Sequence, residues 1–285
     1  MIGSSDGSHD APDGTEHGAP HGAGTSASAP SLDGAAGPGD PATIRFDGVQ
    51  VERGRRTVLD VERLDIGVGS TALVGPNGSG KSTMLHVIAG LIAPTSGSVT
   101  VESTGSGPHG VAYVLQSQLA SRHLLVTARE VVALARTRRF GRAGRADRLR
   151  VDEVMERLGV ADLADRHLAD MSGGQRQRVF IAQGLAQDAG IFLLDEPVAG
   201  LDLASEQTIR QAVEAERASG RTVVVATHDL DEARRADRVV LLNGTVVAAG
   251  PPAEVLTPAF LRRAYRGRVL DLGDGSVAVD DDHHH

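Results

Sequence analysis

The chain has 285 residues, no cysteine and only 2% aromatic residues. Without cysteine there can be neither a disulfide framework nor a thiolate metal site, which fits a reducing cytoplasm without proving it. So few aromatic side chains argue against the stacking platforms that bind single-stranded nucleic acid. Long apolar runs and a signal peptide are also missing, since no run approaches the roughly 20 residues that a membrane-spanning helix needs. We therefore expect a soluble chain.

The formal net charge of -8 comes from the two ends of the chain. Ten of the 37 acidic residues lie in residues 1–41 or 274–285, and neither end contains lysine or arginine. The remaining 27 acidic residues are balanced by 29 basic residues. A nearly neutral globular part offers no electrostatic attraction for nucleic acid or for an anionic membrane surface, so we expect no nucleic-acid partner.

Composition divides the chain into a central domain and two tails. Residues 1–41 are mostly Gly, Ser, Ala, Pro, Asp and His and have almost nothing apolar to bury, so we expect them to be disordered. The chain has room for one substantial α/β core, which we place at residues 42–268, followed by a C-terminal tail at 269–285. The first tail contains histidines among acidic residues, and the chain ends in DDDHHH. Metal binding by these tails stays open beside the simpler interpretation of solvated tails.

Strand and helix patterns alternate through the central domain. Apolar runs bounded by turn residues predict strands at 43–51, 70–74, 98–102, 110–115, 190–194, 222–227 and 238–242. Helical spacing predicts helices at 81–91, 128–135, 147–158, 174–185 and 204–218. Three of these helices fall within a helical insert at about 117–186. The alternation predicts an α/β fold whose parallel sheet is covered on both faces.

Turn residues predict three further features. Residues 94–97 have the composition of a turn. The dipeptide Asn243-Gly244 predicts a hairpin turn into a strand at 245–249, and Thr257-Pro258 predicts the start of a last short helix.

The stretch GPNGSGKST, residues 75–83, follows a predicted strand and opens a predicted helix, which is the context that a phosphate-binding loop requires. Its glycines permit the tight path that turns successive backbone N–H groups inward as an anion site. We expect Lys81 to reach the β- and γ-phosphates, Ser82 to place its hydroxyl on Mg²⁺, and Thr83 to lie beside the α-phosphate. The predicted nucleotide-binding residues are Gly75, Pro76, Asn77, Gly78, Ser79, Gly80, Lys81, Ser82 and Thr83.

The stretch IFLLDEP, residues 191–197, is an apolar strand that ends in two carboxylates. Such residues lie at the carboxyl edge of a parallel sheet, beside the phosphate-binding loop. We expect Asp195 to hold Mg²⁺ through water, and Glu196 to act as the general base that orients the water attacking the γ-phosphorus. Taken alone, the dipeptide could also be an ordinary acidic strand end.

The stretch MSGGQRQR, which begins at Met171, resembles the signature of the ATP-binding cassette (ABC) family, in which LSGGQ is usual. In this chain Met171 replaces the usual leucine, an apolar swap that preserves volume. The signature residues are Ser172, Gly173, Gly174 and Gln175. Ser172 and the two glycines open a predicted helix and form a second N-terminal anion site on the same chain.

The resemblance spans residues 43 to about 268. It implies a P-loop NTPase of the ABC type, with a RecA-like parallel sheet core, an antiparallel β subdomain and a helical insert. It further implies ATP and Mg²⁺ as cofactors. Because the chain has one copy of each motif, the resemblance implies a head-to-tail pair of ATPase subunits, in which the signature of one subunit closes over the phosphate-binding loop of the other.

Three further residues match family motifs individually. Gln116 in YVLQ resembles the glutamine that contacts Mg²⁺ or the attacking water, and His228 in VVVATH resembles the switch histidine on the γ-phosphate. Asp202 in AGLD resembles the loop that crosses the dimer interface, called the D-loop. One position departs from the family: Arg53 stands where an aromatic residue usually stacks on adenine. Arginine can also stack on a ring, so adenine binding is expected to persist with weaker base selectivity.

With one cassette and no predicted membrane span, the resemblance implies a transporter subunit that needs membrane partners. We expect integral-membrane permease subunits docked on the helical insert, an extracytoplasmic solute-binding protein as an indirect partner, and a second ATPase subunit that forms a homodimer. The expected location is peripheral, at the cytoplasmic face of the cell membrane.

The C-terminal part of the domain, from VVLLNGTVVAAGPP to LRRAY, resembles the ATPases of zinc and manganese importers. It predicts an ATPase that energises divalent metal import. Two alternatives stay open: an ATPase of another importer or exporter, for example of iron chelates, and a soluble ABC ATPase that acts on nucleic acid or the ribosome.

Overall fold

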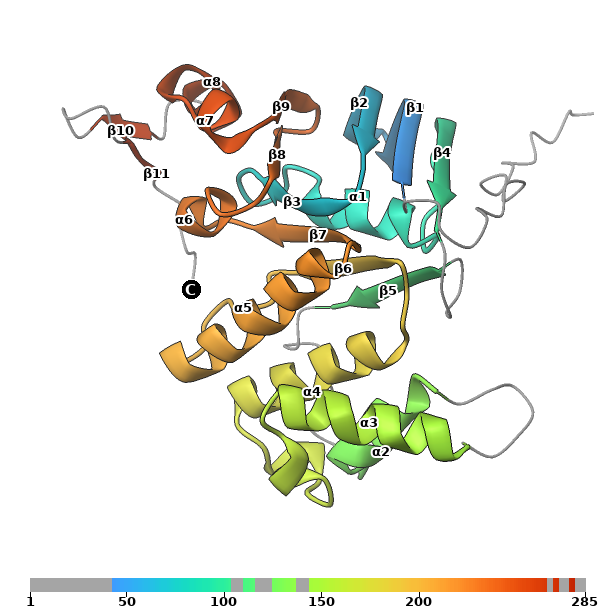
Figure 1. Cartoon of the computed structure of the whole chain (residues 1–285). Coiled ribbons are helices and arrows are strands. Elements are labelled where there is room, and N and C mark those ends of the chain that lie inside the picture. Colours follow the sequence, from blue (N-terminus) through green and yellow to red (C-terminus); the bar gives the residue numbers. More distant parts are fainter. Residues whose placement is uncertain are drawn as a thin grey trace, which may run out of the picture.

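The computed structural model describes residues 43–103, 110–115, 125–136, 144–265, 269–271 and 277–279. The expected disordered tail at 1–41, the histidines of both tails and Gln116 lie outside the described residues. The described part contains strands and helices in alternation, arranged in layers (Figure 1).

The central sheet has six strands in the order β5-β6-β7-β3-β8-β9. Neighbouring strands from β5 to β8 pair in parallel, and β9 joins the edge antiparallel to β8. The six strands are β3 (Gly69–Val74), β5 (Val111–Val114), β6 (Ile191–Asp195), β7 (Thr222–Thr227), β8 (Arg238–Leu242) and β9 (Val246–Gly250). The predicted α/β fold with a largely parallel sheet is therefore confirmed, and so is the hairpin turn at Asn243-Gly244.

Both faces of the inner strands β6, β7, β3 and β8 are buried, which accounts for the apolar runs in these strands. In β6, Ile191 and Leu193 face one core cluster while Phe192 and Leu194 face another. The first cluster contains α1 (Lys81–Ile88) and a separate antiparallel sheet of β2 (Arg56–Ile66), β1 (Thr43–Arg53) and β4 (Ser96–Glu102). Figure 1 shows this small sheet on the α1 side of the central sheet.

Helices cover the other face of the central sheet (Figure 1). The second cluster joins the sheet to α5 (Leu203–Ala218) and to a group of three packed helices: α2 (Ala128–Leu134), α3 (Arg145–Arg157) and α4 (Gly173–Ala186). Two short 3-10 helices, Ala161–Leu163 and Leu168–Asp170, connect α3 to α4. A third cluster packs α6 (Leu230–Ala233), α7 (Pro252–Val255) and α8 (Pro258–Ala264) against β3 and β8.

An ion-pair network joins α3 to α5 and to the residue that precedes β7. The carboxylate of Glu216 on α5 is 2.6 Å from the guanidinium of Arg157 on α3 and 2.6 Å from that of Arg221, next to β7. Arg157 also donates to the carbonyl oxygen of Ala212 at 2.6 Å. Because Glu216 is nearly inaccessible, its buried charge is compensated by these two guanidinium groups, and the network holds α3 and α5 in a defined position.

Several sequence-based boundaries were wrong. The strand β2 was not predicted, because its buried residues Leu59, Val61, Leu64 and Ile66 change phase between 61 and 64 and so break simple alternation. The predicted turn at 94–97 is partly strand, since β4 begins at Ser96 and pairs with Gln50. The helices α6 and α7 were also missed, because each is only four residues long. Within the expected C-terminal tail, β10 (Val269–Asp271) and β11 (Val277–Val279) pair antiparallel.

No helix among the described residues is long and apolar enough to span a bilayer.

Candidate functional site

The glycine-rich loop between β3 and α1 is held tightly against the sheet. A Cβ atom at Gly75 would lie 2.2 Å from the carbonyl oxygen of Leu242 on β8, so only glycine fits there. The N–H of Ser79 donates to the carbonyl oxygen of Pro76 at 3.0 Å, and the carbonyl oxygen of Ser79 accepts from Gly244 at 2.8 Å. The loop is therefore shaped by its own turn and by the β8–β9 hairpin.

The N-terminus of α1 opens into a cavity of about 230 Å³. Its N-cap residue, Gly80, has φ 100 and supplies no side chain to accept from the first-turn N–H groups. Such a terminus, with its dipole and unsatisfied donors, is an anion site. The cavity is lined by Arg53, Val58, Asn77, Gly78, Ser79, Gly80, Lys81, Ser82, Thr83 and Glu196. The structure thus brings Arg53, at the end of β1, to the cavity at the loop, while its contact with adenine stays a prediction.

The side chain of Lys81 folds back over the loop. Its Nζ donates to the carbonyl oxygen of Gly75 at 2.6 Å and to that of Pro76 at 3.4 Å. Only 6% of the residue is exposed. An ammonium group that is hydrogen-bonded to carbonyl oxygens can exchange them for phosphate oxygens with little loss of hydrogen-bond energy. Lys81 therefore lies in a position to bind a phosphate that enters the loop.

Two oxygen donors of the type that Mg²⁺ prefers are available. The carboxylate of Asp195 ends β6, and the hydroxyl of Ser82 is exposed in the first turn of α1. The donor set fits Mg²⁺, which is commonly held by one or two protein oxygens together with substrate phosphates. Within the described ranges, no group of three His, Cys, Asp or Glu residues could hold a metal by itself.

The oxygen Oδ2 of Asp195 accepts a hydrogen bond from the hydroxyl of Tyr113 on β5, at 3.3 Å. Burial raises the pKa of Tyr113 well above its usual value, and the neighbouring Asp195 charge raises it further. The phenol therefore remains protonated and acts as a donor. Sequence reasoning missed Tyr113, although its position three residues before Gln116, in the same strand run, is a usable signal.

Glu196 and His228 come together from neighbouring strand ends. The Oε1 atom of Glu196 is 3.7 Å from Nδ1 of His228. Glu196 has φ 47, a left-handed conformation that costs a non-glycine residue about 1–3 kcal/mol and that often marks functional sites. Its N–H donates to the carbonyl oxygen of Ala226 at 2.9 Å, which holds the backbone in place. Glu196 lines both the cavity at the loop and a second cavity of about 200 Å³ that contains His228.

The signature residues form the start of α4, away from the two cavities that Glu196 lines. Ser172 caps this helix: its hydroxyl accepts from the N–H of Gln175 at 3.2 Å, and the Gln175 side chain accepts from the N–H of Ser172 at 3.0 Å. Ser172 and Gly173 are exposed, and none of the signature residues lines the two cavities described above. The structure therefore does not bring the signature to the loop of the same chain.

The signature helix is packed against the start of α5. A Cβ atom at Gly174 would lie 2.6 Å from Oγ of Ser205 and 3.0 Å from Oδ2 of Asp202, so a larger residue would separate the two helices. Asp202 caps α5 by accepting from the N–H of Ser205 at 2.8 Å and from its hydroxyl at 3.0 Å. These hydrogen bonds, the backbone one first, lower the pKa of Asp202. The predicted signature and D-loop residues are thus in direct contact within one chain.

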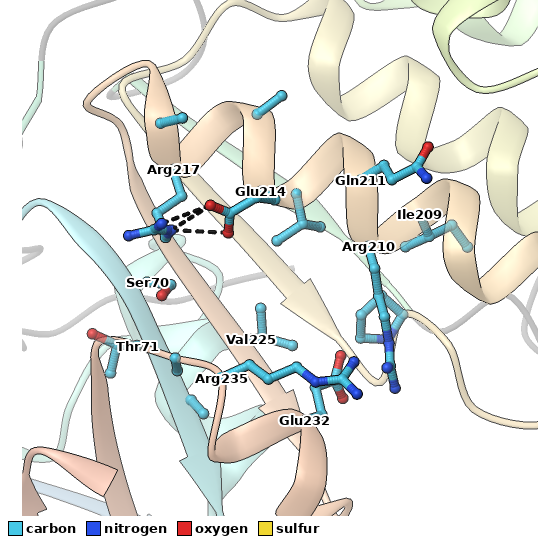
Figure 2. Close-up of a pocket in the computed structure, with 16 residues that line it drawn as sticks. Ser70, Thr71, Ile209, Arg210, Gln211, Glu214, Arg217, Val225, Glu232 and Arg235 are labelled. Atoms are coloured by element: carbon cyan, nitrogen blue, oxygen red, sulfur yellow. Dashed lines mark hydrogen bonds and ion pairs between the residues drawn. The ribbon is translucent and has the colours of Figure 1, made fainter.

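A larger cavity, of about 510 Å³, lies between α5, α6 and the sheet (Figure 2). Its walls include Ala72, Ile209 and Val225, while Arg217 at its edge pairs with Glu214 at 2.6 Å. It contains no residue of the glycine-rich loop, so it is separate from the cavity at that loop. Glu232 borders both this cavity and the one that contains His228, and burial raises its pKa. Sequence reasoning missed Glu232.

Comparisons with known proteins agree with the motifs. The family model described as ABC transporter matches residues 63–199. The chain is 38% identical over 204 residues to the zinc transport system ATP-binding protein TroB of Treponema pallidum, covering 70% of this chain and 77% of the relative. It is 34% identical to the manganese transport system ATP-binding protein MntB of Halalkalibacterium halodurans, covering 79% and 93%. It is 40% identical to a cobalamin import ATP-binding protein of Halobacterium salinarum, covering 83% of this chain but 63% of the relative.

Solved structures show the same fold. A metal-chelate type ABC transporter in an inward-facing conformation matches with a TM-score of 0.70 at 23% identity, covering 84% of this chain and 96% of that chain. An ATP-binding cassette of an ABC transporter in its ADP conformation matches with a TM-score of 0.66 at 24% identity, covering 79% and 99%. These matches agree with the glycine-rich loop, the acidic strand end and the signature, and they show that the chain belongs to the ATP-binding, ATP-hydrolysing cassettes of the ABC transporter family.

Proposed function

We propose that this chain is the ATPase subunit that energises import of a divalent metal ion, zinc or manganese, through a separate permease. The observation that carries the cargo assignment is the similarity to zinc and manganese transport ATPases over most of their lengths, 77% and 93%. The cobalamin relative has a similar identity, but the match covers only 63% of it. A hemin import relative from Rhodococcus jostii, 38% identical with 81% covered, makes import of an iron chelate the second candidate.

Nucleotide binding would use the N-terminus of α1. The triphosphate lies in the loop, where backbone N–H groups from Gly78 to Thr83 donate to its oxygens, and Lys81 exchanges its carbonyl partners for the β- and γ-phosphates. Arg53 covers the adenine ring with its guanidinium plane. The residues proposed to bind the triphosphate and the residue proposed to bind the adenine line the same cavity.

Mg²⁺ would be held by the hydroxyl of Ser82 and, through water, by Asp195, with Gln116 as a further proposed ligand from outside the described residues. When bound, the ion neutralises charge that develops on the β- and γ-phosphates. The protein's own part is to fix the two oxygen donors at the ends of β6 and the loop.

Hydrolysis would use Glu196 as the general base and His228 as its partner. Glu196 borders both cavities, so it can accept a proton from a water that attacks the γ-phosphorus. His228, 3.7 Å from its carboxylate, can donate to a γ-phosphate oxygen and respond to the presence of that phosphate.

Two copies would form the working enzyme. Because Ser172 and Gly173 are exposed and lie apart from the loop of their own chain, we propose that they close over the nucleotide of a second copy, with Asp202 at the interface. Because Gly174 packs against Ser205, a shift of α4 would also move the start of α5, which carries Asp202 at the proposed interface.

The proposed partners are integral-membrane permease subunits, docked on the helical group α2–α4, and, through them, an extracytoplasmic solute-binding protein. The proposed location is the cytoplasmic face of the cell membrane, held there by the permease.

The function can be tested with Glu196→Gln. We expect the purified variant to bind ATP and lose at least about 100-fold in ATP hydrolysis, because a general base contributes roughly 10²–10⁴-fold. In cells lacking the native gene, the parental chain should restore uptake of radioactive zinc or manganese, and the variant should not.

The matched control is Glu254→Gln, an exposed carboxylate on α7 away from both cavities, which should hydrolyse ATP at the parental rate. Hydrolysis by Glu196→Gln at the parental rate would contradict the general-base role. Restored uptake of hemin iron, with no change in zinc or manganese uptake, would favour the second candidate.

A further inference from the structure

Tyr113 lies between two parts of the proposed metal site. It is on β5, which pairs in parallel with β6 so that Tyr113 stands opposite Leu193 and two residues before the level of Asp195. Its hydroxyl donates to Oδ2 of Asp195 at 3.3 Å. This contact joins residues 82 positions apart in the chain and exists only because the two strands are neighbours.

The ring of Tyr113 is fixed from the other side by α1. The ring of His86 meets it edge to face, with centroids 5.7 Å apart and planes at 80°. His86 and Ser82 are four residues apart on α1, about one helical turn. Tyr113 therefore touches the strand end that carries Asp195 and the helix that carries Ser82.

The carboxylate of Asp195 needs such a contact if it is to hold a metal in one orientation. A carboxylate at a strand end can rotate about its last side-chain bond, and one oxygen engaged by a fixed donor stops that rotation. In the described part of the chain, the phenol is the side-chain donor to Oδ2, and the ring that carries it is half-buried between β5 and α1.

We propose that Tyr113 is a positioning residue for the magnesium ligand Asp195, holding its carboxylate through Oδ2 and keeping it in register with the helix that carries Ser82. This inference rests on the proposed metal role of Asp195. Partners of this kind, which orient a metal ligand without touching the metal, typically change metal affinity about 10–100-fold when removed. Because 3.3 Å is long for a bond to a carboxylate, we expect the lower end of that range.

The test is Tyr113→Phe, which removes the hydroxyl and keeps the ring that packs on His86. We expect the Mg²⁺ concentration for half-maximal ATP hydrolysis to rise about 10-fold, with hydrolysis recovering at high Mg²⁺. Mn²⁺ binding to the full chain with a non-hydrolysable ATP analogue, followed by electron paramagnetic resonance, should weaken by a similar factor. Affinity for a fluorescent ATP analogue in EDTA should stay at the parental value, because the phosphate loop is untouched.

The chain offers a matched control in its only other tyrosine. Tyr265 is buried at the end of α8 and lines neither the cavity at the loop nor the one that contains His228, so Tyr265→Phe also removes a tyrosine hydroxyl but should leave Mn²⁺ affinity unchanged. A structural role for Tyr113 would weaken nucleotide binding in EDTA and lower the unfolding temperature without a selective change in metal affinity.

Parental Mn²⁺ affinity in Tyr113→Phe would overturn the inference, as would an equal loss of Mn²⁺ and metal-free nucleotide binding. Asp195→Asn separates this outcome from failure of the proposed function. If Asp195→Asn weakens Mn²⁺ binding and Tyr113→Phe does not, the positioning role alone is wrong. If neither variant weakens it, the metal role of Asp195 is wrong as well.

Discussion

Arg53 lies at the end of β1 and borders the cavity that contains the glycine-rich loop. Its side chain is exposed, and its guanidinium plane can cover a base by stacking and cation–π attraction. An aromatic ring would offer a larger apolar face and lose less side-chain freedom on binding. Under the proposed role of Arg53, the residue at this position would affect how tightly the base is held more than whether the phosphates bind.

At the residue scale, we expect Arg53→Tyr to tighten ATP binding by a few-fold and to increase the preference for ATP over GTP. Stacking on aromatic side chains is worth about 1–3 kcal/mol per base, part of which the arginine already supplies. Titration of the parental chain and the variant with ATP and GTP, in Mg²⁺, measures both effects. An unchanged or weaker dissociation constant for ATP would reject a stacking role at this position.

At the scale of elements, the helices differ in whether a side chain caps their first turn. The helix α1 starts at Gly80 without a side-chain cap, so its first-turn donors face the cavity. The helices α4 and α5 start with capping side chains from Ser172 and Asp202. The proposed contact of Ser172 with a second copy therefore has to coexist with, or replace, the hydrogen bond that caps its own helix.

This difference gives a paired prediction for Ser172→Ala and Thr127→Ala. Both residues form a capping box, at the start of α4 and α2, so each substitution should lower the free energy of unfolding by about 1 kcal/mol. Only Ser172→Ala should also slow ATP hydrolysis, by at least about 10-fold, since only Ser172 is proposed to meet a nucleotide. Urea unfolding and steady-state hydrolysis measure the two effects.

Equal hydrolysis by the two variants would mean that Ser172 serves its own helix alone. Because the stability loss is shared, a fall in hydrolysis seen in both would report partial unfolding and not a contact between copies.

At the scale of the whole molecule, the loop and the signature are parts of one chain that face different surroundings. The helix α4 belongs to the group α2–α4, while the loop lies on the other side of the sheet with α1 (Figure 1). In the proposed dimer, a single copy would thus supply both halves of a nucleotide sandwich without closing it. A head-to-tail pair related by a two-fold axis is the simplest arrangement that closes both.

The absence of cysteine makes this arrangement directly testable. We expect chains carrying Asn77→Cys to crosslink to chains carrying Gly173→Cys through a short bismaleimide, in the Glu196→Gln background with ATP and Mg²⁺. Both positions are exposed, and Gly173 has open space for a side chain. Mixed dimers on a denaturing gel are the measurement.

The control replaces Gly173→Cys with Ser219→Cys, which is exposed at the opposite end of α5 from Asp202, about 25 Å along the helix axis. It should give no mixed dimer. Crosslinks that form equally with ADP, or never form with ATP, would contradict closure over the nucleotide.

The motifs themselves could be read from the sequence because their chemistry is local. An anion site at a helix start needs glycines, a lysine and a hydroxyl within a few residues, and Gly75 to Thr83 contain all of them between a strand and a helix. The acidic pair Asp195 and Glu196 could be placed at a sheet edge for the same reason, since the apolar run before it predicts a buried strand. The sequence by itself therefore determined the α/β class, the glycine-rich loop and the acidic pair at the end of a buried strand.

The tertiary structure alone decided which of these residues meet. The strand order β5-β6-β7-β3-β8-β9 places Tyr113 beside Asp195, and it places the end of β7 beside Glu196. The residues that meet across these neighbouring strands are dozens of positions apart in the chain. The same is true of Gly174 against Ser205, and of Gly75 against Leu242. Such contacts depend on how the elements pack and on which strands are neighbours, and both are set by the summed burial of whole elements. They therefore cannot be recognised from the residue spacing within a short motif.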